Sequence, residues 1–398
     1  MKKIILHIDV NSAFLSWSAI KLLQDGYKKD IRNEISVIAG DPKKRHGVVV
    51  AASIPAKKMG IKPPINLSDA RKIYRNLMVV QPDYYFYKME SDKLMSYLKK
   101  LFPIVEQFSI DECFVDYTSI KKIYGDEVLF ANKLKDNIYK KFGFTVNIGI
   151  GNNKLCAKMA SDFEKPNKVH TLYLEEFASK MWPKDISELF MAGKKTCEKL
   201  RELGINTIKE LANCDVNILT NRLKSIGKLL HDYANGIDDS IVDDTSYDRR
   251  KSIGYSKTLE QSSDNQHLLY KYLSVFSKKI SSYLIDKNIY INTLVITIRD
   301  DYFKTISHQE KYLNAFNKEE QIYEYSKALF KKLWDGNKVR LIGLSATDFT
   351  SNQNYQLSLF EANNTKDDSL DKLITTLNKS LGKNVIFKCN ELNKESRK

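Results

Sequence analysis

Residues 108–116 read FSIDECFVD, with an acidic pair between two short apolar segments. This pattern predicts two strand segments around Asp111 and Glu112, because short apolar runs with alternating faces are typical of strands. A further strand is predicted over residues 4–9, where alternating apolar side chains end at Asp9. The sequence therefore predicts a sheet in which separate strands carry carboxylates near their ends.

Carboxylates in this arrangement suit a site for two magnesium ions. Mg²⁺ prefers hard oxygen ligands, usually one or two carboxylates together with water and substrate phosphates. Two such ions, about 3.5–4 Å apart, can stabilise both the attacking and the leaving oxygen of an in-line displacement. Two plainer interpretations stay open on these residues alone. Asp9 could cap a helix that begins near Ser12, and Asp111 with Glu112 could form an exposed hairpin turn.

The composition indicates a globular protein with a polyanionic partner. The chain has 398 residues, of which 42% are hydrophobic and 28% charged, as is ordinary for a soluble protein of several domains. The 64 Lys and Arg outnumber the 49 Asp and Glu and give a net charge of +15. Such a surplus most often indicates a nucleic-acid partner, and a merely basic, highly soluble protein is the alternative.

Neither membrane insertion nor disulfide formation is expected. No stretch approaches the roughly 20 apolar residues that span a bilayer, and the apolar run near the start is too short for a signal peptide. The five cysteines are scattered and form no CxxC pair, which argues against a disulfide framework or a zinc site. We therefore expect a cytoplasmic protein with no membrane partner.

The other elements predicted before the last block are a strand, several helices and an irregular acidic stretch. Residues 48–52 predict a buried strand and residues 128–142 an amphipathic helix. Residues 174–236 favour short helices with glycine-centred turns. The acidic stretch 238–248 is followed at once by basic residues, which indicates an interdomain linker. A solvated loop inside one domain is the alternative.

The last large block has the element order β-α-β-β-α-β. The predicted elements cover 252–259, 266–286, 294–298, 302–312, 321–334 and 339–347. This order is typical of a four-stranded sheet with two helices on one face. The polar tail that follows contains a predicted helix between Ser369 and Gly382.

Four segments of the chain carry a family resemblance. They read HIDVNSAF at 7–14, ASIPAKKMGIK at 52–62, FSIDECFVD at 108–116, and GIGNNKLCAKMASD at 149–162, which continues into EKPN at 164–167. In this order they resemble the Y-family (translesion) DNA polymerases, particularly the bacterial polymerase IV group. The resemblance spans about residues 4–360.

This resemblance implies an α+β, multidomain, right-hand polymerase. The palm would be ferredoxin-like, the fingers small, the thumb helical with a helix-hairpin-helix, and the little finger β-α-β-β-α-β. The implied boundaries are 1–11 and 83–172 for the palm, 12–82 for the fingers, 173–238 for the thumb, 239–250 for a linker, 251–350 for the little finger and 351–398 for a tail with a clamp-binding peptide.

The resemblance also implies the reaction. The enzyme would add deoxynucleoside triphosphates to a primer 3′-hydroxyl on template DNA, with low fidelity and past damaged bases, in DNA repair and damage tolerance. Two Mg²⁺ ions would be held by Asp9, Asp111 and the backbone carbonyl of Val10, and Glu112 would complete the site. We expect the protein to act as a monomer.

Three side chains are implied to form the nucleotide pocket. Phe14 would be the steric gate, a stiff ring at the position of a ribose 2′-hydroxyl, and Lys57 and Lys165 would bind the triphosphate. The family often has Tyr and Arg where this chain has Ile54 and Lys57. Ile54 donates no hydrogen bond and Lys is a point charge where Arg is bidentate, so the triphosphate contacts should differ. A core aromatic and surface lysines are the plain alternatives.

DNA contacts are implied in two places. Gly193, Lys194 and Lys195 lie in a segment that resembles the thumb's helix-hairpin-helix, which points N–H groups at a phosphate. Met191 stands where that motif usually has glycine, and a plain helical turn is the alternative. Arg299 and Arg340 lie on predicted little-finger strands and suit sequence-independent phosphate binding.

Residues 356–360, QLSLF, resemble the bacterial sliding-clamp peptide. Gln356 would supply a polar anchor, and Leu357, Leu359 and Phe360 would enter a hydrophobic pocket of the clamp. A tail strand that packs on its own domain is the alternative.

Two other functional classes compete with a polymerase. A non-catalytic DNA- and clamp-binding accessory protein would be expected to lose metal carboxylates, and this chain has all three. A nucleotide cyclase shares the two-metal palm, but it would need neither the thumb-like hairpin nor the basic final domain. The sequence therefore favours the polymerase.

Overall fold

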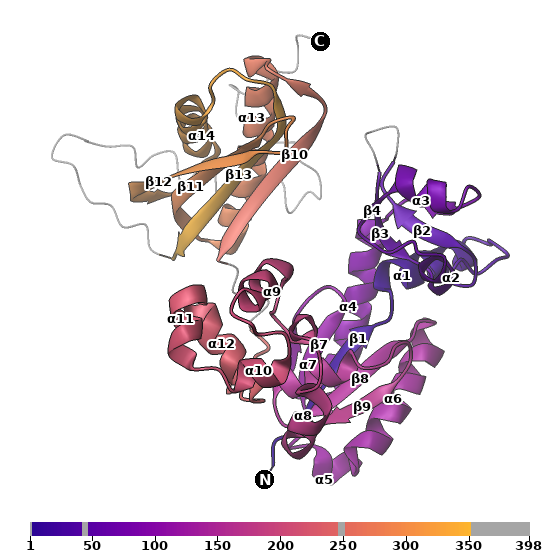
Figure 1. The fold of residues 1–398 in the computed structure, drawn as a ribbon. Coiled ribbons are helices and arrows are strands. Elements are labelled where there is room, and N and C mark those ends of the chain that lie inside the picture. Colours follow the sequence, from indigo (N-terminus) through magenta and orange to yellow (C-terminus); the bar gives the residue numbers. More distant parts are fainter. Residues whose placement is uncertain (1, 42–46, 246–250, 352–398) are drawn as a thin grey trace. The chain divides into compact units, whose positions relative to one another are not determined.

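The chain forms two compact units in the computed structural model, Met1–Arg250 and Lys251–Lys398 (Figure 1). Each unit has a hydrophobic core of its own. The structure describes residues 2–41, 47–245 and 251–351.

A five-stranded sheet forms the centre of the first unit. Its strand order is β6-β7-β1-β8-β9, and neighbouring strands are antiparallel except for β8 and β9. The strands span Ile5–Val10 (β1), Val105–Gln107 (β6), Glu112–Asp116 (β7), Val146–Gly151 (β8) and Val169–Leu172 (β9). β1 is buried along its whole length because it lies between two strands and has helices on both faces.

Helices cover this sheet on both sides. On one face, α4 (Tyr84–Leu101) and α6 (Glu127–Phe142) share a continuous core with β1. On the other face lies α7 (Lys154–Ser161), where Ala157 packs against Ile5. The order β1-α4-β6-β7-α6-β8 is the β-α-β-β-α-β order of a ferredoxin-like domain, so this part of the predicted fold is confirmed.

Two glycines let α7 approach β8 closely. A β-carbon at Gly149 would lie 2.0 Å from the carbonyl oxygen of Ala157, and one at Gly151 would lie 2.5 Å from Cβ of Cys156. The helix therefore packs directly on the strand. Ser161, at the end of the helix, forms a hydrogen bond with His7 on β1.

A small α+β insertion separates β1 from α4 (Figure 1). Its sheet has the order β4-β3-β2-β5. Its elements span Ala13–Gln24 (α1), Ser36–Ala39 (β2), Val48–Ala52 (β3), Ile54–Lys58 (α2), Ile65–Asn66 (β4), Leu67–Ile73 (α3) and Met78–Val80 (β5). The prediction of a fully buried strand at 48–52 is wrong for one face. Val48 is 46% and Val50 38% exposed, and Val50 lines an open pocket.

Short helices follow β9, as the sequence predicts, and share a core with one side of α7. They span Leu174–Met181 (α8), Ile186–Glu188 (η2), Lys194–Arg201 (α9), Ile208–Ala212 (α10), Val216–Leu223 (α11) and Ser225–Ala234 (α12). The acidic stretch after them returns to the sheet. Val242 packs beside Ile5, and the Asp243 N–H donates to Glu106 Oε2 at 3.0 Å. The stretch is therefore anchored to the first unit at least as far as Asp243.

The second unit has the predicted β-α-β-β-α-β order. Its elements span Ser252–Ser263 (β10), Gln266–Lys287 (α13), Tyr290–Arg299 (β11), Thr305–Phe316 (β12), Glu319–Leu333 (α14) and Val339–Thr350 (β13). The sheet is antiparallel with the order β10-β13-β11-β12, and its core lies between the sheet and the two helices. The predicted helix between Ser369 and Gly382 lies outside the described residues.

Within the described ranges, every helix is too short or too polar to cross a membrane.

The close packing of α7 on β8 predicts a large effect of a single methyl group. Gly149→Ala should lower the free energy of unfolding by about 1–3 kcal/mol, because the new β-carbon meets backbone atoms that cannot yield without moving the helix. Denaturant unfolding measures this change. Gly40→Ala is the matched control, since no atom lies within 4 Å of its β-carbon position and it should shift stability little. Equal effects of both substitutions would contradict the packing argument.

Candidate active site

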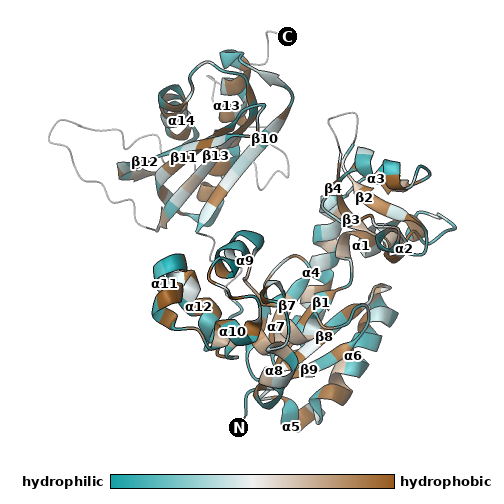
Figure 2. Ribbon diagram, in the orientation of Figure 1, coloured by the Kyte–Doolittle hydropathy of each residue, from teal (hydrophilic) through white to brown (hydrophobic). Residues whose placement is uncertain are grey.

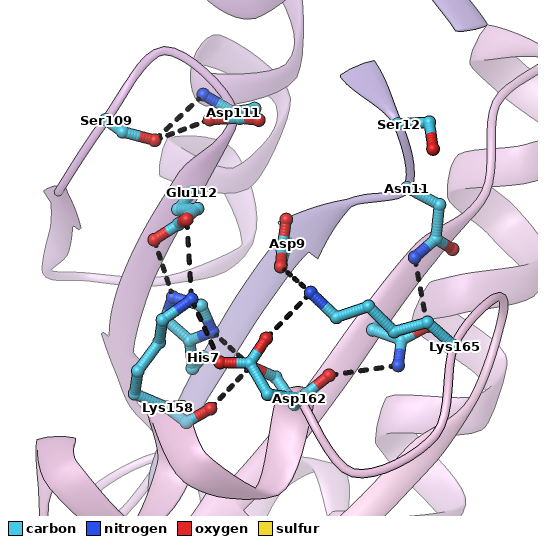
Figure 3. A network of polar contacts seen from close by, with 12 residues as sticks. His7, Asp9, Asn11, Ser12, Ser109, Asp111, Glu112, Lys158, Asp162 and Lys165 are labelled. Atoms are coloured by element: carbon cyan, nitrogen blue, oxygen red, sulfur yellow. Dashed lines mark hydrogen bonds and ion pairs between the residues drawn. The ribbon is translucent and has the colours of Figure 1, made fainter. Parts of the chain in front are cut away.

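The register of β1 and β7 brings two of the predicted carboxylates together. Asp9 and Glu112 are directly opposite each other on these neighbouring strands. Asp111 precedes Glu112, and its carbonyl oxygen accepts a hydrogen bond from the Val10 N–H at 3.0 Å. All three acidic residues, together with the backbone of Val10, therefore lie at one edge of the sheet (Figure 3).

The two plainer interpretations of the carboxylates do not describe this edge. The N-cap residue of α1 is Ser12, and the Asp9 carboxylate instead accepts a hydrogen bond from the ammonium group of Lys165. Glu112 is the first residue of β7, and Asp111 is only partly exposed. The acidic pair is therefore part of the sheet and not a solvated turn.

Each carboxylate has a different polar partner (Figure 3). Asp111 Oδ1 accepts a hydrogen bond from Ser109 Oγ at 2.6 Å. Glu112 lies between two basic side chains. Its Oε2 is 3.3 Å from Nε2 of the buried His7, and its Oε1 is 3.4 Å from Nζ of Lys158. Neither His7 Nε2 nor Glu112 Oε2 makes a well-aligned hydrogen bond, so the contact is chiefly electrostatic.

Burial and neighbouring charges move the pKa values of these groups in opposite directions. Burial raises the pKa of Asp111, and the negative charges of Asp9 and Glu112 raise it further. Burial also acts to raise the pKa of Glu112, but His7 and Lys158 outweigh it and lower that pKa to about 2. The pKa of His7 is lowered by burial. The edge therefore holds carboxylates that repel one another and that a cation would stabilise.

The donor set at this edge fits a hard divalent cation. Asp9, Asp111 and Glu112 supply only oxygen atoms, and Glu112 Oε2 is buried without a hydrogen-bond partner. In the part of the chain that the structure describes, no three His, Cys, Asp or Glu side chains converge closely enough to hold an ion as they stand. The reason is visible in Figure 3, where the carboxylates turn toward separate partners.

A pocket of about 370 Å³ lies beside the carboxylates. It is lined by Ser12, Ala13, Phe14, Val50, Ala51, Ala52, Lys57, Pro63 and Asp111. Three residues that the sequence singled out for separate roles, Phe14, Lys57 and Asp111, therefore border the same space.

Phe14 is held by aromatic neighbours. Its ring stacks on the fully buried Tyr87, with centroids 4.9 Å apart and planes 12° apart. Tyr84 meets it edge-on at 5.9 Å. The Tyr87 hydroxyl is in turn 2.5 Å from Ser18 Oγ. A ring packed in this way has little freedom to move out of the pocket.

Two lysines place positive charge near the pocket. Lys57 Nζ donates to Ser12 Oγ at 3.3 Å, and burial and the nearby charge of Lys165 lower its pKa. No acidic side chain among the described residues forms an ion pair with Lys57. Burial acts to lower the pKa of Lys165 as well, but Asp9 and Asp162 outweigh it and raise that pKa. Two ammonium groups that repel each other favour the binding of a polyanion.

Sequence reasoning missed several residues of this site. His7, Lys158 and Ser109 hold the carboxylates, yet none was assigned a role. For His7 a signal was present, because strand alternation places it on the same face as Asp9. Lys158 and Ser109 lie inside the segments that carry the family resemblance, but nothing in their spacing indicates which carboxylate they contact.

Comparison with known proteins identifies the family. Residues 8–162 match the sequence model of the impB/mucB/samB family, and residues 250–359 match the C-terminal domain of that family. DNA polymerase IV of Clostridium acetobutylicum is 42% identical over 400 residues, which cover 100% of both chains. DNA polymerase IV 1 of Bacillus subtilis is 32% identical, over 100% of this chain and 95% of the relative. This chain belongs to the DNA polymerase IV family.

A solved structure shares the fold of this polymerase IV family member. A Y-family DNA polymerase chimera matches with a TM-score of 0.76, over 88% of this chain and 100% of that chain, at 22% identity. The predicted fold class, a multidomain right-hand polymerase, is therefore confirmed.

The residues predicted to contact DNA lie on both units. Gly193 is the N-cap of α9, whose surface is largely hydrophilic (Figure 2) and includes Lys194 and Lys195. Met191, at the position where the motif usually has glycine, has φ +70°. This left-handed conformation is the reason that glycine suits the position, and Met191 adopts it under strain.

The two predicted arginines differ in their surroundings. Arg299 Nε donates to Thr305 Oγ1 at 2.7 Å across β11 and β12. Arg340 lies over the ring of Phe303, 4.4 Å from its centroid. The clamp-like residues Gln356, Leu357, Leu359 and Phe360 lie outside the described residues.

The opposite surroundings of two carboxylates predict opposite effects of the same substitution. Asp111→Asn should raise the free energy of unfolding by about 1 kcal/mol in the presence of a chelator, because a carboxyl with a raised pKa costs stability when it is ionised. Asp9→Asn should lower the free energy of unfolding, because the substitution removes the ion pair with Lys165. Thermal unfolding measures both, and shifts of the same sign would contradict this electrostatic account.

Proposed function

We propose that the chain is a template-directed DNA polymerase that extends a primer 3′-hydroxyl with deoxynucleotides and tolerates damaged template bases. The supporting observation is the register of β1 and β7, which brings Asp9 and Glu112 together next to Asp111, a residue that lines the same pocket as Phe14 and Lys57. The accessory-protein and cyclase alternatives are not favoured, because the catalytic carboxylates are present and the relatives are DNA polymerases. The four described cysteines are free, which suits a reducing cytoplasm.

The carboxylate edge is proposed to hold two Mg²⁺ ions. Asp9 and Asp111 would ligate them with the Val10 carbonyl, and Glu112 would complete the set on the primer side. When bound, the ions lower the pKa of the attacking hydroxyl and neutralise charge on the triphosphate. His7 and Lys158 keep Glu112 ionised, so at neutral pH the carboxylate carries the charge that a metal ligand needs.

Lys165 is proposed to bind the triphosphate. In the structure its ammonium group neutralises Asp9, and it therefore stands in for the cation that this carboxylate would otherwise hold. A side chain that is 38% exposed can turn from Asp9 to a phosphate without moving its backbone. Lys57, whose ammonium group pairs with no carboxylate among the described residues, would bind the same polyanion.

The replacement of the family's usual Tyr and Arg by Ile54 and Lys57 should weaken the binding of the triphosphate. Ile54 is 46% exposed and donates no hydrogen bond. Lys57 supplies one point charge, whereas an arginine would form two parallel hydrogen bonds to a phosphate. The proposed enzyme therefore relies more on its metals and on Lys165 than a relative with Tyr and Arg would.

Low fidelity is proposed to follow from the pocket lining. Val50 and Ala51 are small and at least partly exposed, so they give a base pair a surface without enclosing it. An enclosing site rejects mismatches by shape, and a loosely fitting one gives up part of that discrimination.

DNA binding is proposed to use two surfaces. The first is α9, where Lys194 and Lys195 flank free N–H groups at the helix start. The second is the sheet face of the second unit that faces away from α13 and α14. One row across it, Ser256, Gly343, Thr297 and Ser307, consists of small side chains beside which a phosphate backbone can lie closely. Both surfaces predict sequence-independent, salt-sensitive binding.

A sliding clamp is the proposed protein partner. The support is the sequence QLSLF at residues 356–360, a polar anchor with three apolar side chains in a polar tail.

Primer extension tests the proposed function. The native chain should extend a primed template with Mg²⁺ and deoxynucleotides, and Asp111→Ala and Glu112→Ala should each lower the rate at least about a hundredfold, because metal ligands support several kcal/mol of transition-state stabilisation. Asp136→Ala, on the exposed surface of α6, is the matched control and should extend normally. DNA binding without extension by the native chain would instead support the accessory protein.

The packing of Phe14 predicts a change in sugar selection. Phe14→Ala should incorporate ribonucleotides at least about tenfold more readily relative to deoxynucleotides, because the space taken by the ring becomes free for a 2′-hydroxyl. Single-nucleotide insertion with both sugars measures the ratio. Tyr139→Ala removes a half-exposed aromatic ring elsewhere and should leave the ratio unchanged. An unchanged ratio in Phe14→Ala would show that another residue is the gate.

A further inference from the structure

The loop that carries Lys165 rests on two buried asparagines. Asn147 lies on β8 directly opposite Asp9 and is fully buried. Its Nδ2 donates to the carbonyl oxygens of Ser161, at 3.0 Å, and Glu164, at 2.7 Å. Its Oδ1 accepts from Asn11 Nδ2 at 3.1 Å and from the Lys168 N–H at 3.2 Å. The amide therefore uses both of its donors and both of its acceptor positions.

Asn11, the residue that follows β1, makes the remaining side-chain contact to the loop. It is 8% exposed, and its backbone N–H donates to the Thr145 carbonyl at 3.0 Å. Its side-chain Oδ1 accepts from the Asn167 N–H at 2.9 Å, while its Nδ2 donates to Asn147. The two asparagines thus bind the main chain at residues 164, 167 and 168, on both sides of Lys165. They leave the Lys165 side chain free to reach Asp9 (Figure 3).

The chemistry of these positions requires amides. An aspartate at either position would place carboxylate oxygens against oxygen acceptors, because the Asn147 amide donates to two carbonyl oxygens and the Asn11 amide donates to Asn147 Oδ1. An apolar residue would leave the Glu164 carbonyl or the Asn167 N–H without its side-chain partner, which is unfavourable. The hydrogen bonds of the two amides to one another and to the main chain restrict the loop to one backbone arrangement.

The location of the network separates it from an ordinary structural contact. Asn147 is the register partner of a proposed metal ligand, and Asn11 follows that ligand by two residues. The same two strands therefore fix the carboxylate and the loop whose lysine faces it. Displacement of the loop would change the position of the Lys165 ammonium group relative to Asp9 without altering either side chain.

We propose that Asn11 and Asn147 are positioning residues that present Lys165 to the triphosphate of the incoming nucleotide. This inference rests on the proposed function, because it requires Lys165 to bind that group. It assigns the two asparagines a part in nucleotide affinity through the loop backbone, with no contact of their own to the substrate.

Equilibrium binding without turnover tests the proposal. The full chain is bound to a primer–template with a dideoxy-terminated primer in the presence of Ca²⁺, and the dissociation constant of the next correct deoxynucleoside triphosphate is measured. Asn11→Ala should weaken binding about tenfold in the native background and less than about twofold in the Lys165→Ala background, because the effect passes through that lysine. Asn11→Ser keeps an oxygen that can accept from Asn167 and should recover part of the loss.

Asn235→Ala is the matched control. The Asn235 amide also donates to backbone carbonyls, of Ala212 and His231, but it lies among the helices after β9. It should lower the melting temperature without changing nucleotide affinity.

The outcomes separate this proposal from the proposed function. If the native chain does not bind the nucleotide, or Lys165→Ala binds it as well as the native chain does, then the role of Lys165 fails and the inference fails with it. If Lys165→Ala weakens binding but Asn11→Ala only lowers the melting temperature, the proposed function stands and the asparagines are merely structural. Equal losses from Asn11→Ala in both backgrounds would likewise overturn the inference.

Discussion

The antiparallel pairing of β1 with β7 is the constraint on which the rest of the site depends. It places Asp9 opposite Glu112, and the hydrogen bond from the Val10 N–H to the Asp111 carbonyl fixes the third acidic residue at the same edge. Side chains alternate along a strand, so a register shift by one residue would turn Glu112 to the opposite face. The burial of β1 on both faces makes such a shift costly, since the core contacts of its apolar residues would be lost.

The same edge shows how a protein can hold acidic groups close together without a cation. Asp9 is neutralised by Lys165, and Glu112 lies beside the Lys158 ammonium group and the buried His7, whereas Asp111 has only the Ser109 hydroxyl. The unequal compensation explains why the pKa of Asp111 is raised while that of Glu112 is lowered. It also means that the proposed metals and triphosphate replace interactions that already exist. Lys165 connects the proposed metal site with the proposed triphosphate site, because its ammonium group can move from a carboxylate to a phosphate.

Local patterns in the sequence predicted much of this arrangement. Alternation identified β1, the apolar periodicity identified α6, and the element order of the second unit followed from the same patterns. The family resemblance placed Phe14 and Lys57 at one pocket, although they lie 43 positions apart in the sequence. What could not be predicted depends on contacts between distant residues. Asn11 contacts Asn147, 136 positions away, because β1 and β8 are paired next to each other in the sheet. No spacing rule in the sequence predicts that contact.

The central claim is that the three acidic residues bind a pair of divalent cations next to the primer end. Counting Mn²⁺ by electron paramagnetic resonance, in a complex of the chain with a dideoxy-terminated primer–template and a matching deoxynucleoside triphosphate, tests it most directly. The account predicts two ions per native chain and a loss of at least one in Asp111→Ala. Equal occupancy in the native chain and in Asp111→Ala, or no ion beyond the one that free nucleotide carries, would contradict it.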